Sequence, residues 1–227
     1  MVSRSELALK RVFDSSMSFV IILLLAPFFL ILALAILLND RGPIFFTQKR
    51  IGRGGKSFLV YKFRCIRVSA APVDGLFGSG DLSKVSVVGK FLRRTKLNEM
   101  PQLINVLIGD MSFVGPRPEV EKWVAVYPER WALVLKVKPG ITDLASIVYW
   151  NEEDILSGSV DPEKTYREIV LPKKLDICED YIANYSFSGD MKIIFATIAA
   201  FLTKNGLFRC KKKKYAVLEK AGWGRVA

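Results

Sequence analysis

The sequence contains no histidine among its 227 residues. This absence excludes catalytic schemes that pair a serine or cysteine nucleophile with histidine, and it excludes zinc sites built on histidine ligands. The three cysteines, Cys65, Cys178 and Cys210, are isolated and odd in number. They fit neither a disulfide framework nor a paired-cysteine zinc site, and they indicate a reducing compartment.

Acidic residues are also few, 22 against 34 basic ones, which leaves a formal net charge of +12 and an isoelectric point near 9.7. The surplus predicts an anionic partner. Nucleic acid, an anionic bilayer and a phosphorylated substrate all meet that requirement, and charge alone does not choose among them. The length allows one ordinary domain plus a membrane element, but not two large domains.

One long hydrophobic segment is present. From Met17 to Leu38, only Ser18 and Pro27 interrupt an apolar run. As a helix it is about 33 Å long, about one hydrocarbon thickness, so a single spanning helix is the simple interpretation. Pro27, however, bends a helix near its middle, and basic residues flank both ends, which the positive-inside rule places in the cytoplasm. We therefore favour a re-entrant membrane helix in residues 1–40.

Residues 41–227 have the mixed composition of a cytoplasmic domain. Residues 138–142 are expected to form a turn. Residues 191–203 predict an amphipathic helix on a membrane, with the basic residues of 204–214 contacting anionic lipid. The fold class is therefore α-rich α+β, with a small membrane-associated domain that carries amphipathic helices. Other expected elements are strands at 44–47 and 58–61, a surface loop at 69–83, and helices at 88–94, 102–107, 119–135 (on either side of Pro128) and 163–184.

The most informative stretch runs from Phe91 to Pro118 and reads FLRRTKLNEMPQLINVLIGDMSFVGPRP. Proline is tolerated in the first turn of a helix, so Pro101 predicts a helix start within 97–100, with Asn98 as the cap. Asn98 and Glu99 then lie at a helix N-terminus, where free N–H groups and the helix dipole favour a phosphate.

Basic side chains accompany this helix start. Arg117 lies between two prolines, so its guanidinium can present a fork to a phosphate at little ordering cost. Lys62 and Arg64, at the end of an expected strand, and Arg94 add positive charge. Each alone is consistent with a surface ion pair or a turn. Together they favour a phosphate-bearing substrate.

The motifs FLRRT and GDMSFVGPRP, with QKRIGRGGKSFLVYKFR at 48–64 and the hydrophobic run, resemble the bacterial sugar transferase family, the small monotopic phosphoglycosyl transferases. The resemblance implies transfer of a phosphosugar from a UDP-sugar to a polyprenyl phosphate, with release of UMP, at the cytoplasmic face of the bacterial inner membrane. This would be the first membrane step of glycan assembly. The resemblance also implies a covalent phosphosugar–enzyme route with Mg²⁺.

Carried onto this sequence, the resemblance assigns roles to individual residues. Glu99 matches the second member of a catalytic Asp-Glu pair. Arg117 matches the arginine of the GPRP motif, and Lys62 matches the lysine of the YKF segment. Asp176 matches an acid in a later helix. Glu99 and Asp110 are the expected magnesium ligands.

Asn98 stands where the family has the nucleophilic aspartate, and an amide cannot do the work of that carboxylate. Three explanations stay open. Glu99 or another acid takes over, the substitution was engineered to stop turnover, or the chain is a catalytically silent membrane scaffold that binds without catalysing. A second departure lies at 143–146, where Asp-Leu-Ala-Ser replaces the frequent Gly-Trp-Ala-Gln. We expect this loop to contribute to the choice of sugar.

A membrane-tethered nucleic-acid-binding module is the competing class of function. It requires aromatic side chains interleaved with basic ones, and only residues 61–64 show that pattern, which the family motif already explains. The expected partners are a UDP-sugar, a polyprenyl phosphate and membrane lipids, with no nucleic acid. The identity of the sugar, the lipid length and the oligomeric state stay open, with a homodimer as one option.

Overall fold

The computed structural model describes residues 4–68, 84–150 and 152–204, and it has the helix-rich α+β organisation that the sequence predicts. The expected loop at 69–83 and the basic residues beyond 204 lie outside the described residues. The strands are β1 (Phe45–Ile51), β2 (Ser57–Phe63), β3 (Ser112–Val114) and β4 (Gly140–Thr142). The helices are α1 (Arg4–Asn39), α2 (Val87–Arg94), α3 (Gln102–Ile108), α4 (Glu121–Val124), α5 (Pro128–Val134), α6 (Leu144–Val148), α7 (Glu152–Ser157), α8 (Pro162–Thr165), α9 (Leu171–Ala183) and α10 (Phe187–Lys204).

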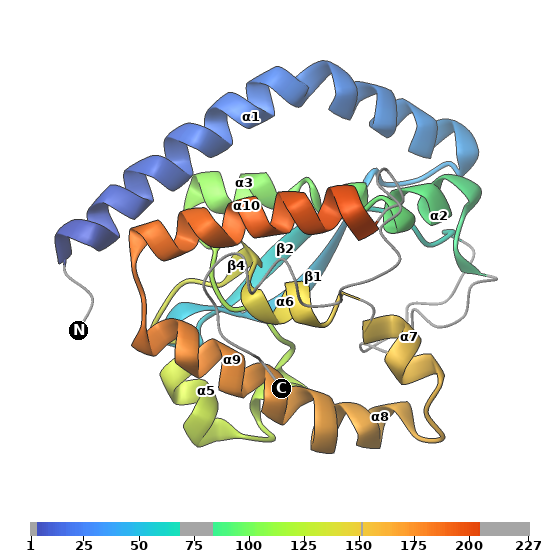
Figure 1. Ribbon diagram of the computed structural model, residues 1–227. Coiled ribbons are helices and arrows are strands. Elements are labelled where there is room, and N and C mark those ends of the chain that lie inside the picture. The colour runs from blue at the N-terminus through green and yellow to red at the C-terminus, as the bar shows by residue number, and fades with distance from the viewer. Residues whose placement is uncertain (1–3, 69–83, 151, 205–227) are drawn as a thin grey trace.

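Helix α1 has 36 residues with Pro27 inside it, and it arches over one side of the molecule (Figure 1). Helices α2, α3 and α10 lie beneath the arch, whereas α5, α8 and α9 lie on the opposite side. Within the described residues, α1 is the one helix long and apolar enough to cross a membrane. Its outward side chains are apolar and largely exposed: Leu23, Leu24, Leu30, Ile31 and Leu38.

The first half of α1 is fastened to the domain by polar side chains. Lys10 is buried, donates to the carbonyl of Val114 at 3.0 Å and forms an ion pair with Asp190 of α10. Arg11 donates to the carbonyls of Val106 and Leu107 at 2.6 and 2.8 Å. These are unpaired carbonyls of the last turn of α3, where a cation also suits the helix dipole.

The second half of α1 is fastened to the same domain by apolar packing. Leu32 and Ile36 are buried in a cluster with Phe63 of β2 and Leu92 of α2. Both halves of the arched helix therefore rest on one body.

A hairpin of β1 and β2 forms where the sequence predicts two short strands, and the two strands pair antiparallel with Phe46 opposite Lys62. Buried Asn105 of α3 holds the edge of β2. Its side-chain oxygen accepts from the N–H of Tyr61 at 3.0 Å, and its amide nitrogen donates to the carbonyl of Leu59 at 2.7 Å. Because the edge groups are paired in this way, β2 is held in register with α3.

The turn expected at 138–142 is wrong in part, because residues 140–142 form β4, which pairs with β3 in parallel. Parallel pairing needs a long connection, and helices α4 and α5 supply it here. Gly115 and Gly140 allow the contact. A Cβ on Gly140 would lie 2.2 Å from the nitrogen of Gly115. Such non-local pairing leaves no periodic signal in three-residue strands.

The helix start expected within 97–100 is also wrong. Lys96 adopts a left-handed backbone conformation with φ 58°, residues Leu97–Glu99 form a 3₁₀ turn, and α3 begins only at Gln102. Asn98 therefore caps no helix, and its side-chain oxygen Oδ1 is buried without a hydrogen-bond partner in the described part of the chain. Asn98 and Glu99 lie on a tight turn ahead of the helix.

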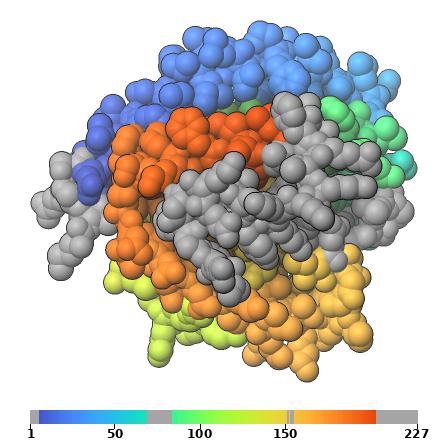
Figure 2. All heavy atoms as spheres, in the orientation of Figure 1, coloured from blue at the N-terminus to red at the C-terminus, as the bar shows by residue number. Residues whose placement is uncertain are grey.

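Helix α10 confirms the apolar helix expected at 191–203. Ile193, Ala196 and Ala200 are buried, yet Phe195 and Ile198 on the other face are exposed, at 70% and 51%. In Figure 2, α1 forms the upper rim of the molecule with α10 below it. The exposed apolar side chains of α10 thus lie near the apolar arch.

The Lys10–Asp190 pair gives a testable prediction. Asp190 is 1% exposed and also accepts from the hydroxyl of Tyr181 at 2.8 Å. Lys10→Met leaves this carboxylate buried without its cation, and we expect a loss of about 3–5 kcal/mol in unfolding free energy, measured by urea titration in micelles. Lys10→Met with Asp190→Asn should recover most of the loss.

The exposed pair of Lys122 and Glu163 supplies the control. Lys122→Met should cost less than about 1 kcal/mol. If Lys10→Met costs no more than this control, the buried pair does not fasten α1.

Candidate active site

The carboxylate of Glu99 is held by two cations that arrive from distant parts of the chain. Lys62 of β2 donates to Oε1 at 2.9 Å. Arg117, in the loop after β3, binds in bidentate fashion, with Nη2 at 2.5 Å from Oε1 and Nη1 at 3.2 Å from Oε2. Three segments that are far apart in the sequence thus meet at one carboxylate. They are strand β2, the 3₁₀ turn of Leu97–Glu99 and the loop that carries Arg117.

The three charges perturb one another. Burial alone would raise the pKa of Glu99, but Arg117 and Lys62 outweigh burial and hold this pKa well below its ordinary value. Burial lowers the pKa of Lys62, and Glu99 opposes that shift only in part. Glu99 raises the pKa of Arg117 above its ordinary value. Glu99 is therefore ionised at neutral pH, with both oxygens occupied by cations.

This cluster opens into a pocket of about 970 Å³. The pocket has a charged end and an apolar wall. The charged side chains are Arg93, Lys96, Glu99, Arg117, Glu152 and Lys174. The apolar wall includes Ile21 of α1, Leu103 of α3 and Phe201 of α10. The long apolar helix α1 therefore contributes directly to the pocket. Such a pocket suits a ligand with phosphate at one end and hydrocarbon at the other.

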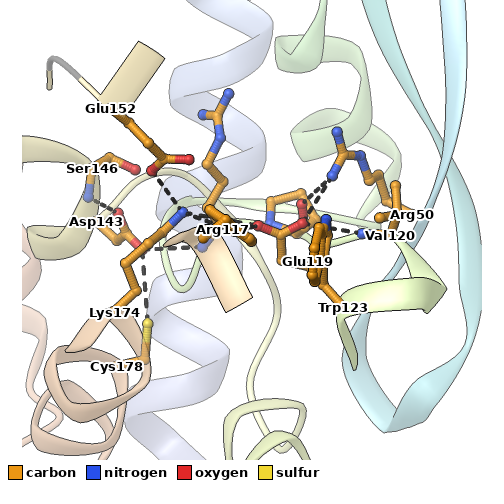
Figure 3. A network of polar contacts seen from close by, with 12 residues as sticks. Arg50, Arg117, Glu119, Val120, Trp123, Asp143, Ser146, Glu152, Lys174 and Cys178 are labelled. Carbon is orange, nitrogen blue, oxygen red and sulfur yellow. Dashed lines mark hydrogen bonds and ion pairs between the residues drawn. The ribbon is translucent and has the colours of Figure 1, made fainter. Parts of the chain in front are cut away.

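Behind the pocket lies a network of buried polar groups, drawn in Figure 3. Lys174 of α9 donates to Glu152 at 3.0 Å and lies 3.8 Å from the carboxylate of Glu119. Glu119 also accepts from Arg50 of β1 at 3.2 Å and from the hydroxyl of Tyr166. Burial would lower the pKa of Lys174, but its acidic neighbours, led by Glu152, raise it instead. The ammonium of Lys174 therefore stays charged and connects the pocket to the core.

Of the eight predicted site residues, Glu99 and Arg117 line this pocket, whereas Lys62, which contacts Glu99, and Asn98 do not. The other four lie elsewhere. Arg64 pairs with Asp40 at the end of α1. Arg94 is exposed on α2 and does not line the pocket. Asp176 is exposed and pairs with Arg130. Asp110 follows the far end of α3, about 10 Å of helix from Glu99.

For Arg94 and Asp176, a residue one or two positions earlier in the sequence lines the pocket. Arg93 lines the pocket instead of Arg94, and Lys174 lines it instead of Asp176. Helical phase is the signal that could have found both. Residues 171, 174, 175 and 178 share the buried face of α9, whereas Asp176 lies roughly 200° around the helix from Lys174. Arg94 is likewise turned away from buried Leu92.

The described residues contain no group of three histidine, cysteine, aspartate or glutamate side chains that could hold a metal ion. Glu99 and Asp110 do not meet. Asn98 adjoins Glu99 in the sequence but does not line the pocket, and its Oδ1 is buried, so Glu99 is the one of these three side chains that could hold Mg²⁺ together with substrate phosphates. A metal held jointly with substrate fits these residues, and one held by protein alone does not.

Comparison with known proteins identifies the family to which this chain belongs. Residues 5–204 match the family described as Bacterial sugar transferase. An exopolysaccharide production protein PSS of Rhizobium leguminosarum is 37% identical over 211 residues, covering 88% of this chain and 98% of that protein. The chain therefore belongs to the bacterial sugar transferase family.

Other relatives carry more specific names. The UDP-glucose:undecaprenyl-phosphate glucose-1-phosphate transferase of Escherichia coli is 39% identical over 194 residues, which cover 84% of this chain and 39% of that protein. A UDP-N-acetylgalactosamine-undecaprenyl-phosphate N-acetylgalactosaminephosphotransferase of Aeromonas hydrophila is 32% identical over 201 residues, covering 87% of this chain and 44% of that protein. The chain thus spans about two fifths of the length of these two relatives, which act on different sugars.

The charge cluster makes a prediction about pH. Glu99→Gln removes a negative charge beside Lys62, so the pKa of Lys62 should fall further below its ordinary value. We expect the variant to bind UDP more tightly than the parent at neutral pH in metal-free buffer. As the pH is raised, Lys62 should lose its proton earlier in Glu99→Gln than in the parent. The UDP affinity of the variant should therefore begin to fall at a lower pH than that of the parent, as measured by calorimetry.

Asp176→Asn is the matched control, because it neutralises an exposed carboxylate outside the pocket. If the UDP affinity of Glu99→Gln falls at the same alkaline pH as that of the parent, Lys62 does not contact the phosphates.

Proposed function

We propose that the site of this chain is built to transfer a phosphosugar from a UDP-sugar to a polyprenyl phosphate, with release of UMP, at the start of a glycan assembly pathway, and that Asn98 holds turnover far below that of a carboxylate at the same position. The observation that carries the proposal is a pocket in which Glu99 and Arg117, with Lys62 bound to Glu99 from β2, meet apolar side chains of α1 and α10. Cations can bind the diphosphate of the nucleotide sugar and the phosphate of the lipid acceptor. The apolar wall can take the first isoprene units.

The proposed reaction has two displacements. A carboxylate oxygen forms a bond to the phosphorus next to the sugar, and the bond from that phosphorus to the bridging oxygen breaks, so the electron pair leaves with UMP. A phosphate oxygen of the polyprenyl phosphate then attacks the same phosphorus and frees the carboxylate. Arg117 and Lys62 stabilise negative charge on the transferring group in both displacements.

We propose that Glu99, which lines the pocket, holds Mg²⁺ together with substrate phosphates when substrate is bound. The ion would neutralise charge on the phosphates and polarise the bond to the leaving group. Lys62 and Arg117 remain the groups by which the protein itself orients the diphosphate. Asp110 takes no part, because it lies at the other end of α3.

We propose that α1 is a re-entrant helix embedded in the cytoplasmic leaflet of the bacterial inner membrane. Its length of about 54 Å exceeds a hydrocarbon core of about 30 Å. Support comes from the docking of both halves, through Lys10 and Arg11 on one side of Pro27 and Leu32 and Ile36 on the other. The exposed apolar face of α10 would then contact lipid as well.

The substitution at Asn98 gives a prediction about chemistry. An amide oxygen is a poor nucleophile, and Glu99 is already held by two cations, so the chain as written should form no phosphosugar adduct. Asn98→Asp should form one and gain turnover by several orders of magnitude. The measurement is intact-protein mass spectrometry, with UMP release, across a panel of UDP-sugars with Mg²⁺.

An adduct on the Asn98 chain would contradict this prediction and would identify another carboxylate as the nucleophile. Glu99 is the first candidate because it lines the pocket. In the double variant Asn98→Asp with Glu99→Gln, the carboxylate at position 98 is present and the one at position 99 is absent, so an adduct there is carried by position 98. Binding of UDP-sugar without an adduct in either chain would instead favour the silent scaffold.

The membrane arrangement is tested by cysteine labelling. Leu9→Cys and Leu38→Cys place exposed thiols near the two ends of α1, and Leu24→Cys places one near Pro27. In a background lacking the natural cysteines, an impermeant maleimide should label neither end in intact cells and both ends in inverted vesicles. Leu24→Cys should react in neither. Labelling of one end from outside would make α1 a spanning helix.

A further inference from the structure

Asp143 lies between two walls of the pocket. It follows β4, it is 5% exposed, and its two carboxylate oxygens serve different segments. Oδ1 accepts from the N–H of Ser146 at 2.6 Å, which caps α6. Oδ2 accepts from the main-chain N–H of Arg117 at 3.1 Å (Figure 3).

The hydrogen bond from the main-chain N–H of Arg117 to Asp143 is hard to replace. Proline has no N–H, so Arg117 carries the single main-chain donor of the triplet Pro116–Pro118. Around this triplet, Gly115 donates to the carbonyl of Thr142, and Gly140 donates to the carbonyl of Pro116. These two bonds pair the strands, but neither holds the Arg117 residue itself. Asp143 supplies the contact that fixes where the main chain of Arg117 lies.

The other oxygen of Asp143 acts on the opposite wall. Helix α6 has only five residues, and this cap satisfies the free N–H of its first turn and fixes where the helix begins. Four residues in and just after α6 line the pocket: Ser146, Ile147, Tyr149 and Trp150. A carboxylate can accept both bonds at once, whereas a hydroxyl or an amide has a single acceptor oxygen for the two donors.

We propose that Asp143 is a positioning residue that sets the fork of Arg117 against the phosphate site and aligns α6 across the pocket. Asp143 does not line the pocket and acts through Arg117 and α6. The expected effect of Asp143 on UDP affinity rests on the proposed function, in which Arg117 binds phosphate. The expected effect of Asp143 on the position of Arg117 does not depend on that function.

Asp143→Ser separates the two roles, because serine is a good helix cap but cannot reach a second donor. We expect Asp143→Ser to weaken UDP binding about tenfold in calorimetry. In an Arg117→Ala background the same substitution should change affinity by less than about twofold, since a residue acting through Arg117 has no effect once that side chain is gone. An equal loss in both backgrounds would refute the proposal.

Asp161→Ser is the matched control. Asp161 caps α8 through the N–H of Lys164 and does not contact Arg117. It should change neither UDP affinity nor the side-chain spectrum described next. A loss of affinity equal to that of Asp143→Ser would assign the effect to general loss of a cap.

A ligand-free measurement keeps the proposal separate from the proposed function. In protein labelled with ¹⁵N-arginine, the side-chain Nε–H resonance of Arg117, assigned with Arg117→Lys, should be sharp and dispersed because the fork is held on Glu99. Asp143→Ser should shift or broaden it. An unchanged resonance overturns the positioning role, whereas failure of the parent chain to bind UDP overturns only the proposed function.

Discussion

The interaction on which the rest of this structure depends is the burial of the Glu99 carboxylate between Lys62 and Arg117. A buried charge is costly unless it is paired and hydrogen-bonded, so the fold has to bring three remote segments to one point. Asn105 holds β2 against α3, and the close approach of Gly115 and Gly140 brings the Arg117 loop alongside β4. The packing of the small domain can be understood as the scaffold for this cluster.

The same logic extends to α1. A bent apolar helix could attach to a domain in many ways, but here buried polar contacts specify one. Arg11 satisfies the last carbonyls of α3, whose other end adjoins the turn that carries Glu99. The helix that touches the membrane element at one end and the charge cluster at the other is only seven residues long. The position of α1 and the position of the proposed phosphate site are therefore both tied to one short helix, α3.

Parts of this arrangement are readable from sequence because they are local. A proline on each side of Arg117 marks that residue, and the place of Lys62 at the end of an expected strand marks the other, without knowledge of the fold. Arg94 and Asp176 do not line the pocket, because helical phase, and not charge, decides which side chain turns inward, and their neighbours Arg93 and Lys174 line it. Asp143 was noticed only as a departure within a loop, since its partners lie across a non-local strand pair.

Asn98 acquires a physical meaning within this cluster. Lys62 and Arg117 carry two positive charges against the single negative charge of Glu99, so the cluster has one positive charge in excess. A second carboxylate at position 98 would cancel that excess at the place where a diphosphate must bind. With the neutral amide the site attracts phosphate more strongly, while it loses the oxygen best suited to attack phosphorus. Under the proposed function, the substitution therefore shifts the balance of the site from chemistry toward binding, and Asp143, as the proposed positioning residue, would maintain the geometry on which that binding depends.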